Sequence, residues 1–202
     1  MITRDRFDNL KERYSEFSSW ALWAHTEPGE PITARTGDLS ALDPDVNSRL
    51  LEELNPEVVL LGLNASSRGA EMEREPWRNF HDASGNAKDY KIRFAFRDTP
   101  YWGAYMTDVF VHLPETDSRK VARWRAENPD KVAEQLHRLE SELDALGSVD
   151  PLIVVFGGLA FSSLPRSLRE THRVVQIEHY SNWIGKEDYR AKVLAQLSTA
   201  NS

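Results

Sequence analysis

The stretch VVLLGLNASSRG, residues 58–69, limits the possible folds of this chain more than any other segment. Residues 58–61 are apolar without interruption, whereas a half-buried strand alternates apolar and polar residues. Such a run is typical of a strand that is buried on both faces of a parallel sheet. Glycine, asparagine and two serines follow within a few positions. We therefore expect a central strand with a polar carboxyl end.

Three further segments have the composition of strands, and helical patterns separate them. The expected strands are residues 58–61, 105–111, 152–156 and 173–178. Apolar spacing predicts helices over residues 3–25, from 118 to about 146 with a break at Asn128-Pro129, and over 187–197. Asp43-Pro44 and Gly157-Gly158 each predict the start of a shorter helix. This alternation predicts an α/β fold, a three-layer αβα arrangement around a central four-stranded parallel sheet.

The length of 202 residues is typical of one domain. We expect a helical N-terminal region over residues 1–57, a core over 58–182 that carries the motifs below, and a C-terminal helix over 183–202. Residues 64–100 show no sustained periodicity, although they contain several aromatic side chains. A long aromatic loop of this kind is typically functional or covers the surface.

Composition excludes several kinds of site. The chain has no cysteine, which excludes disulfides, thiolate catalysis and iron–sulfur ligation, and its six histidines are not at metal-binding spacing. We expect no metal, no cofactor and no membrane partner, and the absence of an apolar signal core near the N-terminus predicts a cytoplasmic location. The net charge of −7 disfavours non-specific nucleic-acid binding, but residues 119–125 and 166–173 are locally basic. Trp20, Trp23 and Trp124 are candidate exposed anchors for a protein partner.

Small, polar and titratable residues follow all four expected strands. Ligands bind at the carboxyl ends of parallel strands, because loops and helix N-termini meet there. The residues at these ends are Gly62, Leu63, Asn64, Ala65, Ser66, Ser67, Thr107, Asp108, Gly157, Gly158, Glu178, His179, Tyr180, Ser181 and Asn182. Each alone is also an ordinary turn or cap residue. Together they predict a ligand-binding edge.

Four of these segments resemble motifs of the uracil-DNA glycosylase superfamily, in the same order along the chain. GLNAS resembles its first motif, in particular the GINPG form of the mismatch-specific branch, and HYSN is similar to its second motif, HPS. YMTDVF and PLIVVFGGLAF are similar to the strands between them. The resemblance runs over residues 58–182.

The resemblance implies a role for each matching position. Asn64 would hold the attacking water, and His179 would donate a hydrogen bond to the carbonyl oxygen of the departing base. Ser181 would contact a backbone phosphate. Further expected substrate contacts are the pocket residues Gly62, Leu63 and Ala65, the polar residues Ser66, Ser67 and Asn182, and a base-stacking aromatic, Phe80 or Trp77.

The chain also departs from the motifs of the superfamily. Ala65 and Tyr180 replace prolines, and Asp108 stands where a base-reading asparagine is expected. An ionised carboxylate offers acceptors only, so it opposes the carbonyls of uracil and favours two adjacent donors, as in guanine or a guanine-like lesion. Asp108 could instead cap a turn or pair with an arginine.

These observations favour a divergent DNA glycosylase-like hydrolase that cleaves the N-glycosidic bond of a damaged or modified base and is not specific for uracil. Its partner would be DNA, as a single strand or with the base flipped out of the duplex. Two alternatives stay open. The chain could bind or hydrolyse a nucleotide or nucleoside, or it could be a catalytically inactive interaction protein on the same scaffold.

Overall fold

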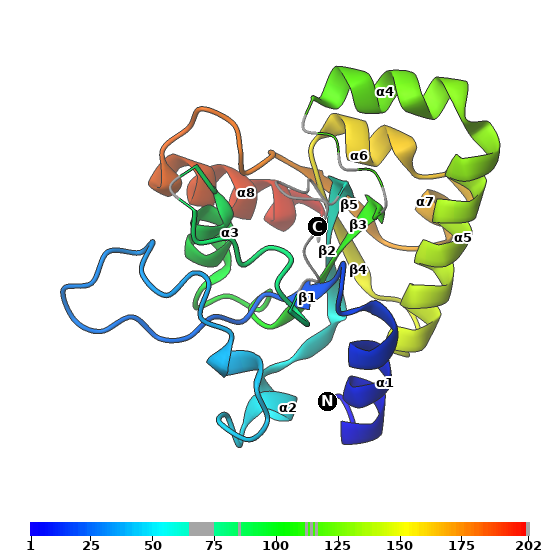
Figure 1. The fold of residues 1–202 in the computed structure, drawn as a ribbon. Helices are drawn as coiled ribbons and strands as arrows, with labels where there is room; N and C mark the ends of the chain where they lie inside the picture. Colours follow the sequence, from blue (N-terminus) through cyan, green and yellow to red (C-terminus); the bar gives the residue numbers. More distant parts are fainter. Residues whose placement is uncertain (65–74, 85, 112, 114, 116, 201–202) are drawn as a thin grey trace.

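Figure 1 shows the computed structural model, which describes residues 1–64, 75–84, 86–111, 113, 115 and 117–200. These residues form an α/β fold with eight α-helices and a five-stranded mixed sheet of order β1-β3-β2-β4-β5. The strands are β1 (Ser19–Trp20), β2 (Asn55–Asn64), β3 (Ala104–Phe110), β4 (Leu152–Phe156) and β5 (Val174–Ile177). The helices are α1 (Arg4–Tyr14), α2 (Leu50–Glu53), α3 (Asp89–Phe96), α4 (Ser118–Glu127), α5 (Pro129–Leu146), α6 (Gly158–Ser163), α7 (Arg166–Thr171) and α8 (Lys186–Ala200), with a 3₁₀ turn at Ser40–Leu42.

The four expected strands are present and parallel to one another, but the sheet is larger and mixed. The short strand β1 pairs antiparallel with β3 and places Trp20 opposite Tyr105. The prediction of one helix over residues 3–25 is therefore wrong, because α1 ends at Tyr14 and the chain then turns into the sheet. The prediction of an entirely parallel four-stranded sheet is wrong for the same reason.

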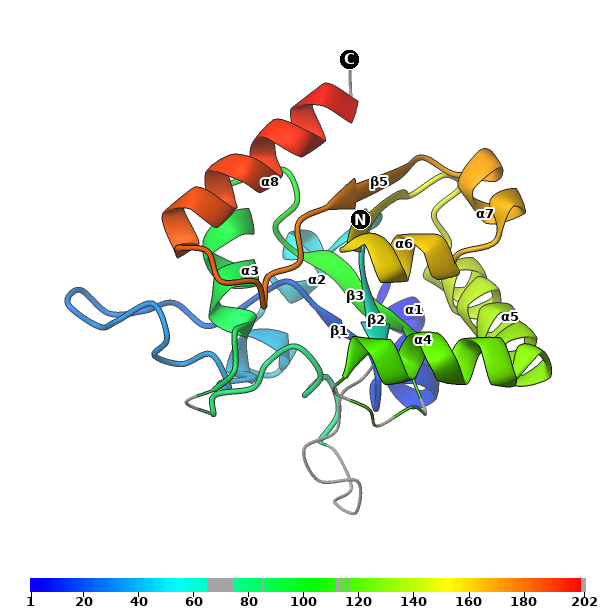
Figure 2. The ribbon, with the colours of Figure 1, turned by 90° about the horizontal axis from the view of Figure 1, so that it is seen from above.

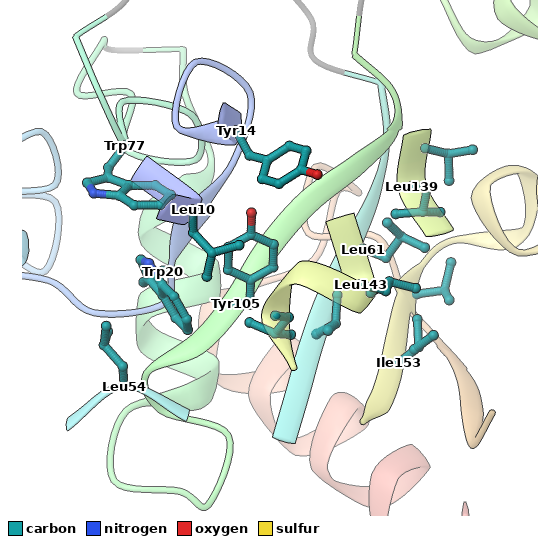
Figure 3. Close-up of a cluster of buried hydrophobic side chains, with 14 of the residues drawn as sticks. Leu10, Tyr14, Trp20, Leu54, Leu61, Trp77, Tyr105, Leu139, Leu143 and Ile153 are labelled. Carbon is teal, nitrogen blue, oxygen red and sulfur yellow. The ribbon is translucent and has the colours of Figure 1, made fainter. Parts of the chain in front are cut away.

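Helices cover both faces of the sheet (Figure 1). Alternate residues of β2 point to opposite sides, so Val59 and Leu61 pack in one core and Val58 and Leu60 in the other. The first core, seen in Figure 3, includes Leu10 of α1 and Leu143 of α5. The second core is formed with side chains of α3 and α8. Burial on both faces explains why the strands are continuously apolar.

Three further expectations differ from the structure. Residues 64–100 contain a helix, α3, which the sequence pattern did not predict. Trp20 and Trp23 are 0% and 2% exposed, so they are core residues and not surface anchors. The short helix expected after Asp43 begins only at Leu50. No helix in the described ranges has the length and apolar character to cross a membrane.

Candidate functional site

A cavity of about 930 Å³ lies at the carboxyl edge of the sheet, the edge that faces the viewer in Figure 2. Its walls come from the carboxyl-terminal parts of β2 and β3, from residues 78–84 and 86–89, and from the turns that follow β4 and β5. Segments that are distant in sequence therefore meet at one place, as the parallel topology predicts. Of the predicted site residues, the cavity is lined by Gly62, Leu63, Asn64, Phe80, Asp108, His179, Ser181 and Asn182.

The deep end of the cavity is built around Gly62. This residue pairs with Asp108 across β2 and β3, and a Cβ atom on Gly62 would lie 2.1 Å from the Asp108 Oδ1 atom. The same Cβ would lie 3.5 Å from the Phe80 ring. Only glycine allows the carboxylate and the ring to approach the strand so closely. A carboxylate and an aromatic wall thus share one end of the cavity.

Asp108 is held in place by its neighbours and is only 3% exposed. Asn79 Nδ2 donates a hydrogen bond to Asp108 Oδ2 at 3.0 Å, and it also donates to the backbone oxygen of Phe17. Because both amide hydrogens of Asn79 are donated, the orientation of its side chain is fixed. Arg138 Nη2 donates to the backbone oxygen of Asp108 at 2.6 Å. The position of Asp108 is therefore determined from two sides.

A fully buried carboxylate supports β3 from the opposite face. Glu142 accepts hydrogen bonds from Tyr105 Oη at 2.7 Å and from Thr107 Oγ1 at 3.2 Å, and it forms an ion pair with Arg138. Ser18 also donates to this carboxylate. Burial raises the pKa of Tyr105 well above 10, so its hydroxyl stays a donor. This network links α5 to the strand that carries Asp108.

The geometry of His179 determines which of its ring nitrogens can act on a ligand. The backbone N–H of Ser181 donates to His179 Nδ1 at 3.1 Å, and Ser181 Oγ lies 2.9 Å from the same atom. A backbone N–H can only donate, so Nδ1 is the acceptor and the neutral ring carries its proton on Nε2. Burial lowers the pKa of His179 below 6.5, against the attraction of Glu178. The ring is therefore neutral at pH 7 and offers an Nε2–H donor.

The turn after β4, which packs against His179, also requires a glycine. Gly157 has a φ of +83°, and a Cβ atom there would lie 3.3 Å from the Cβ atom of His179. Tyr180 stacks on the His179 ring at 4.6 Å between centroids, and its edge contacts Phe156 at 5.2 Å. Burial, followed by the charges of Asp89 and Asp108, raises the pKa of Tyr180 well above 10. Its hydroxyl is thus protonated at neutral pH.

Asn64 is the last residue of β2, and its side chain has a defined orientation. Its Nδ2 atom donates to the backbone oxygens of Leu113 at 2.9 Å and Glu115 at 2.6 Å. Both amide hydrogens are thereby used, and Oδ1 makes no hydrogen bond with a described residue. Asn64 lines the cavity, where it can offer its amide oxygen as an acceptor.

The remaining predicted site residues have different surroundings. Trp77 is not in the cavity, because it packs against Phe7 and Trp20 in the core on the other face of the sheet. Ala65, Ser66 and Ser67 lie outside the described residues. Ser181 contacts His179, and Asn182 Nδ2 donates to Glu178, although both residues also line the cavity.

The arginines of the two basic segments do not line the cavity, although Lys120 of the first segment pairs with the cavity residue Glu115. In residues 119–125, Arg119 pairs with Asp117 and Arg123 with Glu127; in residues 166–173, Arg166 pairs with Glu170 and Arg173 with Asp150. None of these arginines is among the residues that line the cavity. Two cationic residues, Arg78 and Lys88, line the cavity itself. Three lysines, Lys88, Lys91 and Lys186, surround a second hollow of about 590 Å³ that adjoins the cavity at Ser181 and Asn182.

The sequence analysis missed three residues around this site. Asn79 and Asp89 line the cavity, and Trp183 is fully exposed beside the second hollow. Asn79 and Asp89 lie in the segment without periodicity, where no pattern marks them. Trp183 directly follows HYSN, so its place after the second motif was the available signal.

No group of three or more histidine, cysteine, aspartate or glutamate side chains suited to a metal ion occurs in the described part of the chain. A comparison of the chain with protein-family models, curated proteins and solved structures found no match.

Proposed function

We propose that this protein is a divergent DNA glycosylase-like hydrolase that cleaves the N-glycosidic bond of a damaged or modified base. One observation carries the proposal: Asn64 and His179 line the same cavity with fixed and complementary hydrogen-bonding groups. The first offers an acceptor and the second a donor. The superfamily resemblance of GLNAS and HYSN supports the same roles.

The reaction requires a positioned water and stabilisation of the departing base. Water would donate one hydrogen to Asn64 Oδ1 and direct a lone pair of its oxygen at C1′ of the sugar. His179 Nε2–H would donate to a carbonyl oxygen of the base as the C1′–N bond breaks. Neither residue needs to transfer a proton for bond cleavage, which agrees with a neutral histidine whose pKa is below 6.5.

Trp183 supports DNA as the substrate. Its side chain is fully exposed at the second hollow, which adjoins the cavity, and it follows His179 by only four residues. A base within a duplex must leave the stack before it can enter a pocket, and apolar side chains inserted between bases stabilise the opened helix. An exposed tryptophan in water has no structural benefit, whereas in an opened duplex it would stack on the neighbouring bases.

A second candidate is a nucleoside or nucleotide hydrolase with the same chemistry. It is favoured by the net charge of −7 and by the ion pairs that neutralise both basic segments. A small substrate needs the cavity alone and makes no use of Trp183. The two candidates therefore differ in their dependence on this residue.

The test uses oligonucleotides that each contain one uracil, hypoxanthine, xanthine or 7-methylguanine, with alkaline cleavage of the abasic product as the readout. We expect release of at least one base other than uracil, and a large loss of this activity in His179→Ala. Trp183→Ala should affect duplex substrates more than single strands. Release of bases from free nucleosides but from none of the oligonucleotides would favour the second candidate. No release from either would contradict both.

A further inference from the structure

Lys91 on α3 is a buried lysine that lines the second hollow. Its side chain is only 5% exposed, and its Nζ atom donates one hydrogen bond, to the backbone oxygen of Asn182 at 2.9 Å. An ammonium group has three N–H donors, and the other two have no acceptor among the described residues. Burial lowers the pKa of Lys91 below 10.5, and the positive charge of Lys88 lowers it further.

This arrangement is unfavourable for the protein without a ligand. A buried charge is costly unless a counter-ion and hydrogen bonds compensate for its loss of water. The single bond to Asn182 holds α3 to the loop between β5 and α8, but a neutral amide donor could form that bond without burying a charge. An anion in the hollow would supply both the missing negative charge and the missing acceptors.

The other charges of the hollow have mostly the same sign. Its described lining contains three lysines, Lys88, Lys91 and Lys186, and one carboxylate, Glu187, which pairs with Lys186. Lys186 also lies over the ring of Phe94, with Nζ 5.2 Å from the ring centroid. Lys88 forms no ion pair with a described residue. Two lysines of the hollow are therefore without a counter-ion in the described part of the chain.

The hollow is placed to receive a group that projects from the cavity. Ser181, Asn182 and Lys88 line both spaces, and the first two follow His179 directly in the same loop. Figure 2 shows α3 beside α8, at whose start this loop ends. A nucleotide carries its phosphate on the sugar, so a base that enters the cavity leaves its phosphate at the rim.

We propose that the second hollow binds a phosphate group on the sugar of the substrate, through the ammonium groups of Lys88 and Lys91. Lysine binds phosphate as a point charge with charge-assisted hydrogen bonds. The inference rests on the proposed function for the place of the base and sugar. It makes the substrate a nucleotide, either within DNA or free, because a nucleoside would leave both lysines without a counter-ion.

The first experiment uses inorganic phosphate as the probe and needs neither DNA nor cleavage. Thermal unfolding is compared in sodium phosphate and in sodium chloride at equal pH and ionic strength. A ligand that binds the folded state raises Tm with its concentration. We expect a larger rise for the wild type than for Lys91→Met, which removes the charge and keeps the length, or for Lys91→Gln, which also keeps a donor for Asn182.

The control is Lys131→Met, which alters an exposed lysine on α5 that lines neither hollow and should keep the full rise. Phosphate also stabilises proteins through exclusion from their surface, but that effect is common to all variants. Urea unfolding should show Lys91→Met to be no less stable than the wild type, because a buried charge is removed. The same phosphate effect in the wild type and both Lys91 variants, or none in the wild type, would overturn the inference.

The second experiment distinguishes DNA from a free nucleotide as the source of the phosphate. A duplex with a tetrahydrofuran abasic analogue is compared with one in which a neutral methylphosphonate replaces the phosphate on its 5′ or 3′ side. Binding to the wild type should weaken about tenfold or more at one of these positions. Lys91→Met should lose little from the same replacement, as a double-mutant cycle requires for direct partners.

The parallel measurement compares 2-deoxyribose 5-phosphate with 2-deoxyribose by calorimetry on the same two proteins. A preference for phosphate that depends on Lys91 in the duplex identifies DNA as the source. The same preference for the sugar phosphate alone means that the ligand is a free nucleotide, so the DNA glycosylase proposal fails and the phosphate subsite stands. If neither pair of ligands shows a preference that depends on Lys91, the hollow is not a phosphate subsite of the substrate and the inference is overturned.

Discussion

Three side chains of the cavity have only one chemically consistent orientation, which makes their roles testable. Asn64 and Asn79 each donate both amide hydrogens to fixed acceptors, and His179 accepts a backbone N–H at Nδ1. Each is therefore preorganised, so no reorientation is needed when a ligand binds. The consequences differ, because Asn64 offers an acceptor to the cavity, His179 offers a donor, and Asn79 fixes Asp108.

Asn64→Ala should slow single-turnover cleavage by about two to three orders of magnitude, the effect of removing one preorganised polar contact. The matched control is Asn55→Ala at the other end of β2, where Nδ2 also donates to a backbone oxygen, that of Pro100 at 2.9 Å. Each variant loses two side-chain hydrogen bonds with the backbone, because Asn55 Oδ1 also accepts from the Glu57 N–H at 3.1 Å, so they should lose similar stability in urea unfolding. Equal rates in the two variants would remove Asn64 from the mechanism.

His179→Ala should reduce cleavage by about 10²-fold or more, because the donor to the base is lost. In the wild type, activity should fall as the pH drops below the pKa of His179, which lies below 6.5 because of burial. Protonation of Nδ1 would break its hydrogen bond from the Ser181 N–H and turn the ring. The rate of His179→Ala should lack this acidic decline. A decline of the same size in the variant would assign it to another group.

At the scale of elements, residues 75–84 connect the core to the cavity through two residues in the left-handed backbone region. Trp77 has a φ of +67° and Phe80 a φ of +65°, conformations that are unfavourable for aromatic residues. These turns send Trp77 into the core beside α1 and Phe80 to the cavity wall. His81 then fixes the segment to the sheet, with Nε2 lying 3.2 Å from the backbone oxygen of Trp20 in β1.

The anchoring of this segment should depend on pH. Burial lowers the pKa of His81 from 6.5 to about 4. Since the folded state disfavours the charged ring, its contribution is fully present above pH 6.5 and is lost as the pH falls toward 4. The loss should reach about 3 kcal/mol in the free energy of unfolding, at 1.36 kcal/mol for each unit of pKa shift. Urea unfolding between pH 7 and 4 measures it.

Two histidine variants separate this effect from general acid sensitivity. His81→Gln should be less stable at neutral pH, and its stability should change less between pH 6.5 and 4 than that of the wild type. In His137→Gln, which alters an exposed histidine on α5, the free energy of unfolding should change with pH as in the wild type. If the free energy of unfolding of His81→Gln changes with pH as much as that of the wild type, His81 is not the source of the loss of stability at acidic pH.

The accuracy of the sequence predictions at this scale depended on how buried each element is. The four parallel strands were predicted within a few residues, because burial on both faces leaves a continuous apolar run. Helix α3 was missed because Asp89, Lys91 and Arg93 are buried among its apolar residues and obscure the helical pattern. Arg93, for example, donates to the backbone oxygens of Ala24 and Ala34. Strand β1 is two residues long, too short to show any period.

The site was predictable where the topology alone determines position. Asn64, Asp108 and His179 belong to the ends of parallel strands, so the strand assignments bring them together. Phe80 and Trp77 could not be distinguished by sequence, because the choice depends on two left-handed backbone angles. The contact between Asn79 and Asp108 depends on the same turns. The fixed tautomer of His179 follows from a local bond to Ser181 that no pattern reports.

For the molecule as a whole, the central question is how a chain of net charge −7 would approach DNA. The basic segments on α4 and α7 are largely neutralised by neighbouring carboxylates. Of the lysines around the second hollow, Lys186 pairs with Glu187, whereas Lys88 forms no ion pair with a described residue. Lys91 donates to the backbone oxygen of Asn182 at 2.9 Å, which leaves its charge beside the loop that carries Trp183. The DNA should therefore contact this side of the cavity and not α7.

Salt dependence of DNA binding tests this orientation with a pair of variants that change the net charge equally. Lys88→Ala should weaken binding of a duplex and reduce the slope of log K against log salt by about 0.9, the value for one lost phosphate contact. Arg166→Ala also removes one positive charge, but Arg166 pairs with Glu170 on α7 and does not line the cavity, so the slope should be unchanged. Fluorescence anisotropy over a range of salt concentrations measures both slopes. If Arg166→Ala reduces the slope of log K against log salt and Lys88→Ala does not, the DNA lies across α7 and the proposed orientation is wrong. A change in total charge would affect both variants alike, so a difference between them reports a local phosphate contact.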